Sequence, residues 1–167
     1  MVAPAHELDT TAFIAALMGE DELGVVVRAH IHIESVLLRL LDRMVVDQAS
    51  LKRMSLDYGQ RVNLALALGL KAQHGPPLLA VGTLRNAFAH RPETKLSKDR
   101  VDNLYKSLGA EDRQVVQRCY EASNSKMLRE APGLRSLPPK DQFVLMATVM
   151  RGMLIAAGMQ MEGGDAV

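Results

Sequence analysis

The segment from Arg85 to His90, Arg-Asn-Ala-Phe-Ala-His, carries the residue types of this chain that are best suited to chemistry. A guanidinium is always charged and binds phosphate through a fork of donors, and a histidine is well placed to move protons near neutral pH. Pro92 disfavours the helical conformation at the preceding residue, so a helix carrying this segment should end about at His90. There the negative end of the helix dipole favours a protonated imidazole. The candidate catalytic residues for phosphodiester chemistry are therefore Arg85, Asn86 and His90.

The arginine and the histidine of this segment do not face the same way on one helix. Their spacing of five residues places Arg85 and His90 about 140° apart, so one chain cannot readily direct both at one phosphate. A second copy of the helix, packed across a symmetry axis, would complete the arrangement. Gly82 and Ala89 would let another backbone come close. We therefore expect a homodimer with a shared site.

Composition predicts packed helices in a single domain. The chain has 167 residues, of which 48% are hydrophobic but only 4% aromatic, with no Trp. Leu, Ala, Val and Met must fill the core, which suits helices better than a β-sandwich. A net charge of +1 provides no global field that would steer nucleic acid to the protein. The single Cys119 excludes an intramolecular disulfide framework and is expected to be a structural thiol in a reducing cytoplasm.

Capping and breaking residues predict six or seven helices in one domain over residues 1–162, followed by a flexible tail at 163–167. Asp9 and Thr10 can cap the first helix, Ser55 the third and Ser97 the fifth. The expected helices span about 10–18, 22–46, 56–69, 76–90, 98–108, 110–123 and 140–160, with a long loop over 124–139. The apolar stretch 143–159 is shorter than a membrane span and contains Arg151, so we expect a core or interface helix and no membrane association. The stripe Met146, Met150 and Met153 in it suits either place.

The second expected helix carries two polar residues within its apolar face. At 100° per residue its inward arc comprises Leu23, Val26, Ile33, Leu37, Leu40 and Met44, widened by Val27, Leu38 and Leu41. His30 and Glu34 lie inside that arc, and Glu34 should pair with a cation, for which we expect Arg85. His32 should point the other way, so the two histidines are not expected to share a metal ion.

Three segments in order resemble a HEPN-type helical domain, more narrowly the mannitol-operon repressor family. They are Arg28–Ser35, Leu64–Gly69 and Leu84–His90 with the polar Glu93–Lys95 after it. The resemblance implies an all-α HEPN-like bundle and a metal-independent endoribonuclease of the toxin or defence type, without a cofactor. It further implies an active site at a dimer cleft, where His90 assists attack of the RNA 2′-hydroxyl, Arg85 stabilises the phosphate and Asn86 is the polar neighbour.

Two alternatives stay open at this point. The resemblance also includes noncatalytic transcriptional-regulatory or protein-interaction modules, whose partner would be an antitoxin or another regulator instead of RNA. Equally, Arg85 can be a flanking core residue and His90 a C-terminal helix cap. Direct sequence-specific DNA binding is not expected, because Gly75-Pro76-Pro77 makes an awkward tight turn and Arg85 is the lone basic residue of the would-be recognition helix.

Overall fold

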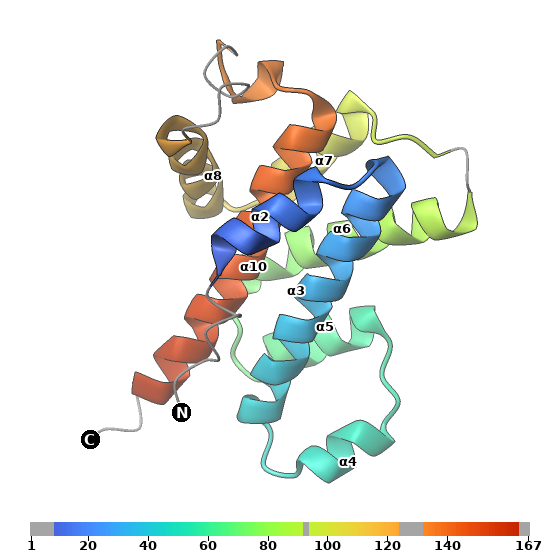
Figure 1. Ribbon diagram of the computed structural model, residues 1–167. Helices are drawn as coiled ribbons and strands as arrows, with labels where there is room; N and C mark the ends of the chain where they lie inside the picture. The colour runs from blue at the N-terminus through green and yellow to red at the C-terminus, as the bar shows by residue number, and fades with distance from the viewer. Residues whose placement is uncertain (1–8, 92–93, 124–131, 164–167) are drawn as a thin grey trace.

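The computed structural model describes residues 9–91, 94–123 and 132–163, which form helices and no strand (Figure 1). The all-α class predicted from the sequence is confirmed, and these residues form eight α-helices, more than the six or seven predicted. The helices are α2 (Thr10–Met18), α3 (Glu22–Met44), α4 (Gln48–Arg53), α5 (Tyr58–Ala67), α6 (Gly75–His90), α7 (Lys98–Ser107), α8 (Ala110–Ala122) and α10 (Pro139–Gly163). Two short 3₁₀ turns, η1 (Ala72–His74) and η2 (Leu134–Ser136), precede α6 and α10.

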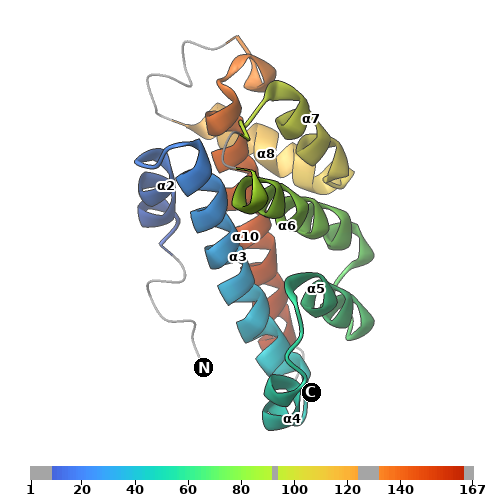
Figure 2. The same cartoon turned by 90° about the vertical axis from the view of Figure 1, so that its right-hand side faces the viewer.

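The two longest helices, α3 and α10, run side by side through the bundle and form its most extensive contact (Figures 1 and 2). Helix α2 packs against both of them, α5 and α6 cover another side of α3, and α7 and α8 pack on α10. The core between these layers is mainly aliphatic, as the composition predicted. Met146 and Met150 are fully buried in it, so these methionines serve the core of one chain. The Lys140 ammonium ties the layers together by donating to the carbonyl oxygens of Met18, at 2.8 Å, and Glu20.

Side-chain caps explain where most of the helices begin. Asp9 accepts a hydrogen bond from Ala12 N at the start of α2, and Ser97 caps α7; both caps were predicted. The predicted cap at Ser55 is wrong. Asp57 begins α5 instead, in a reciprocal capping box with Gln60, while Ser55 lies in the turn before it with φ 51°.

The buried face of α3 differs in part from the predicted arc. Leu23 and Leu38 are 45% and 37% exposed, whereas Val25, Ala29 and Val36 are buried. The reason is that α10 and α2 cover α3 in addition to α5 and α6, so the buried face is turned from the arc expected for one apolar stripe. The helix also ends at Met44, two residues before the predicted end.

The short helix α4 was not predicted, because no residue of it is buried and it has no apolar periodicity to read. Helix α10 is longer than predicted. It runs to Gly163, so the boundary expected between 162 and 163 falls inside it, and the tail from 164 lies outside the described residues. By length and composition alone α10 could cross a membrane, but 61% of its most apolar window is buried within the fold, as in a core helix. Arg151 is 5% exposed and lies over the Phe13 ring, 4.9 Å from its centroid.

Candidate functional site

All three candidate catalytic residues lie on the second half of α6. Arg85 is half-buried, and its Nη1 donates a hydrogen bond to Asn86 Oδ1 at 3.1 Å. Asn86 and His90 are both exposed, on a row that continues back along the helix through Leu79 and Thr83. Asn86 and His90 share this face because they are four residues apart on the helix, and the structure leaves the whole row open to solvent.

Arg85 and Asn86 border an open pocket of about 520 Å³ between α3, α5 and α6. The polar residues that line it with them are His30, Glu34, Asp57, Tyr58, Arg61 and Thr83. His90 does not line this pocket. Within one chain, therefore, the arginine and the histidine of the segment do not converge on one point, as the 140° argument predicted.

The cation that binds Glu34 is Arg61, not Arg85. Arg61 Nη1 of α5 forms a short contact with Glu34 Oε1, and both side chains are about a quarter exposed, 27% and 26% respectively. The prediction that Glu34 has a cationic partner on another helix is confirmed, and the choice of Arg85 is wrong. The physical reason is that α5 packs directly on α3 and carries an arginine at the level of the carboxylate. Among the described residues, the only hydrogen-bond partner of the Arg85 guanidinium is the Asn86 amide.

Tyr58 forms the part of the pocket wall that packs against α6. Its hydroxyl donates to the carbonyl oxygen of Leu78 at 3.0 Å, and its ring lies 4.3 Å from the His30 ring, centroid to centroid. The space above Gly82, predicted to admit a second backbone, is filled by this ring: a Cβ at Gly82 would lie 2.7 Å from two ring carbons. Burial, with a further contribution from the Glu34 charge, raises the pKa of the Tyr58 hydroxyl well above its usual range. Tyr58 is therefore a neutral hydrogen-bond donor at this wall.

His30 is the histidine that shares the pocket with Arg85. It is 5% exposed, and its Nδ1 lies 3.9 Å from Glu34 Oε2. Burial lowers the pKa of His30 below its ordinary value of 6.5; the Glu34 charge opposes this shift and the Arg85 charge adds to it. The imidazole is therefore neutral at pH 7 and above. Spacing alone did not single out His30, Tyr58 or Arg61 for this site, and the one available signal was the four-residue interval between His30 and Glu34.

His32 lies apart from this pocket, edge-on against the Phe13 ring at a centroid distance of 5.2 Å. In the described part of the chain, no three His, Cys, Asp or Glu side chains gather closely enough to hold a metal ion.

The pocket presents two guanidinium groups, those of Arg61 and Arg85, and two carboxylates, those of Glu34 and Asp57. The Asp57 carboxylate accepts a hydrogen bond from Gln60 N in the cap of α5. Because Arg61 neutralises Glu34, the charge of Arg85 remains available to an anion that enters from solvent. A phosphate is the anion that a guanidinium and a neighbouring amide bind well.

Compared with family models, curated proteins and solved structures, the chain matches none of them.

Proposed function

We propose that this chain is a metal-independent endoribonuclease of the HEPN type that acts as a homodimer. Arg85 binds the scissile phosphate, Asn86 fixes the guanidinium, and His90 of the other copy transfers protons. One observation carries the proposal: Arg85 borders an open pocket with only the Asn86 amide as its hydrogen-bond partner among the described residues, while Arg61 holds the nearby carboxylate.

The chemistry requires no metal ion. The RNA 2′-hydroxyl attacks the adjacent phosphorus, a base removes its proton, and the 5′-oxygen leaves with a proton from an acid. The product ends are a 2′,3′-cyclic phosphate and a 5′-hydroxyl. An imidazole can supply the proton transfer, and a guanidinium stabilises the charge that develops on the phosphate oxygens.

The dimer is needed because His90 and Arg85 diverge within one chain. The exposed row Leu79, Thr83, Asn86 and His90 is a stripe on which a second α6 can pack. In a twofold dimer, every contact from residue i to residue j is repeated from j to i. Two such helices in antiparallel contact would direct each His90 toward the Arg85 of the other copy.

The test is cleavage of single-stranded RNA in EDTA, followed by subunit mixing. Arg85→Ala and His90→Ala should each lower cleavage, the histidine variant by about 10²–10⁴-fold. In an equal mixture of the two inactive variants, half of the dimers are mixed and each has one intact composite site. Activity should therefore return to about a quarter of the wild-type value. RNA with a 2′-deoxy sugar at the cleavage position must resist the enzyme.

Matched controls separate this site from other residues. Arg53→Ala removes an exposed arginine of α4 and should leave cleavage unchanged. His30→Gln removes the histidine that shares the pocket with Arg85 in the same chain. If His30→Gln abolishes cleavage and mixing restores nothing, the acid-base group is His30 and the composite site is wrong. Circular dichroism of each variant shows whether it is folded.

A second candidate function is a noncatalytic regulatory or protein-interaction module of the mannitol-operon repressor type. It is favoured by the position of His90, which is exposed and outside the pocket. This candidate requires that folded wild-type protein cleave no RNA and that substitutions on the exposed row of α6 weaken a protein partner's binding.

A further inference from the structure

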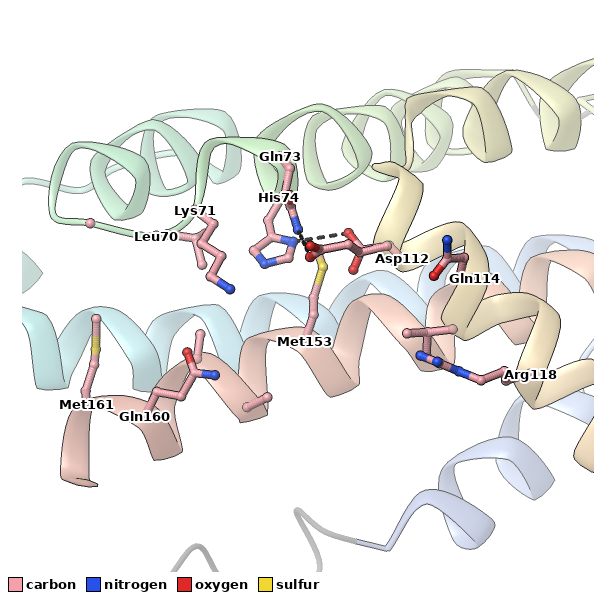
Figure 3. A pocket seen from close by; sticks show the side chains of 15 residues that line it. Leu70, Lys71, Gln73, His74, Asp112, Gln114, Arg118, Met153, Gln160 and Met161 are labelled. Atoms are coloured by element: carbon pink, nitrogen blue, oxygen red, sulfur yellow. Dashed lines mark hydrogen bonds and ion pairs between the residues drawn. The ribbon is translucent and has the colours of Figure 1, made fainter. Parts of the chain in front are cut away.

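A second and larger cavity lies where η1 and the start of α8 face the second half of α10 (Figure 3). Its volume is about 660 Å³, and it shares no lining residue with the pocket beside Arg85. Its floor is apolar, formed by Leu70, Val115, Met153, Ala156, Ala157 and Met161. Such a mixture of an apolar floor and a few polar groups is typical of small-molecule sites.

The most unusual feature of this cavity is a buried histidine paired with a buried carboxylate. His74 is 7% exposed and Asp112 is 6% exposed, and the distance from His74 Nδ1 to Asp112 Oδ2 is 3.2 Å. A carboxylate only accepts hydrogen bonds, so the pair fixes a hydrogen on Nδ1 and holds the ring in one orientation. Within the described part of the chain, His74 Nε2 has no hydrogen-bond partner, and His74 lines the cavity.

Figure 3 shows where this second nitrogen points. Nε2 is on the side of the ring away from Asp112, toward the end of the cavity where the Lys71 ammonium and the Gln160 amide lie. Both acidic side chains of the cavity already have partners. Asp112 is paired with His74, and Glu111 accepts a hydrogen bond of 3.1 Å from Gln73 Nε2. The end of the cavity near Lys71 therefore offers donors and positive charge, next to an apolar floor.

We propose that this cavity binds a small organic anion, a carboxylate or a phosphate with a short apolar body. The anionic group lies between Lys71 Nζ and His74 Nε2, and the apolar body lies against Met153 and Ala157. A hydrogen bond between His74 Nε2 and the anionic group gives the second ring nitrogen a partner, as Asp112 already does for Nδ1. The proposal is independent of the RNA-cleaving site, because no residue is common to the two pockets.

The experiment uses three compounds with the same apolar body: hexanoate, hexyl phosphate and hexanol. Each is titrated into the full chain labelled with ¹³C at its methionine methyl groups, and binding is read by NMR. Met153 and Met161 line the cavity, and Met18, which borders a different apolar groove between α2, α8 and α10, is the internal control. We expect saturable shifts of Met153 and Met161 with at least one anion, no shift of Met18, and an affinity for hexanol about tenfold weaker.

Two variants and a control test whether Lys71 and His74 contact the anionic group. Lys71 is exposed, so Lys71→Gln should fold normally and weaken the binding of the anion about tenfold, without changing that of hexanol. Lys106→Gln on α7, also exposed, should change neither. His74→Gln should also weaken the anion selectively; if it unfolds, the lysine pair alone decides.

The two anions distinguish the carboxylate from the phosphate as the preferred group. The proposal is overturned if hexanol binds as tightly as both anions, or if the two lysine variants are indistinguishable. It is also overturned if neither anion shifts Met153 or Met161.

Discussion

Replacing Gly82 by alanine would place a methyl group 2.7 Å from two ring carbons of Tyr58, which is closer than packed carbon atoms approach. The ring cannot simply swing away, because its hydroxyl is bonded to the Leu78 carbonyl and its face lies against His30. Overpacking of this kind costs about 1–3 kcal/mol. Alanine is also better than glycine inside a helix, by about 1 kcal/mol. The net effect of Gly82→Ala should therefore be a loss of stability of about 0–2 kcal/mol.

A second glycine serves as a control for the gain in helix propensity that any glycine-to-alanine change brings. Gly152 lies within α10, is exposed, and has no atom within 4 Å of the position where a Cβ would be. Gly152→Ala should therefore stabilise the protein by about 1 kcal/mol. The difference between the two alanine variants is the overpacking cost alone, about 1–3 kcal/mol. In a protein of this size each kcal/mol corresponds to about 2–4 °C in Tm.

The assay is urea unfolding followed by far-UV circular dichroism, since the chain has no tryptophan to report by fluorescence. A second measurement tests the cause: in a Tyr58→Ala background the ring is gone, so adding Gly82→Ala should become stabilising. If Gly82→Ala alone stabilises the protein as much as Gly152→Ala does, Tyr58 does not lie against α6. The pocket wall described above would then be wrong.

Two further predictions concern the start of α5 and the buried histidines. Asp57→Ala breaks the capping box with Gln60 and should cost about 1 kcal/mol in urea unfolding, whereas Ser55→Ala should cost less than about 0.5 kcal/mol; equal losses would contradict the assignment of the cap. Burial lowers the pKa of His30 and His32 in the folded protein, so the unfolded chain takes up protons that the folded protein does not. Stability should therefore be complete above a pH of about 6.5 and fall as the pH drops below it. His30→Gln should flatten part of that slope below a pH of about 6.5, and an unchanged slope would refute the assignment.

The sequence alone was sufficient to predict where a helix begins when the residue that caps the helix lies directly before it. The starts of α2 and α7 could be predicted because Asp9 and Ser97 cap helices from within their own segments. The error at α5 is instructive, because Ser55 and Asp57 are both suitable caps. The glutamine at position 60 is three residues after Asp57 and was the signal that could have decided between them.

The site was less predictable because its contacts depend on which helices become neighbours. Nothing in the spacing of Glu34 distinguishes Arg61 from Arg85, since either arginine can reach it only after α5 and α6 have packed on α3. The same holds for Gly82, whose free surface is taken by Tyr58 from 24 positions earlier in the chain. The burial of His30 was predictable from its place on the apolar face of α3. Its presence in one pocket with Arg85 was not.

The contact of Lys140 with the end of α2 has a consequence for how the protein must be made. Its ammonium binds carbonyl groups that are 122 and 120 positions earlier in the chain. Lys140 lies in the first turn of α10, the helix that makes the most extensive contact with α3. At a synthesis rate of about 5–20 residues per second, α3 waits on the order of 6–24 s before that cover emerges from the ribosome. During this time the part of α3 that α10 covers in the folded protein stays exposed, a state in which nascent chains aggregate or bind chaperones.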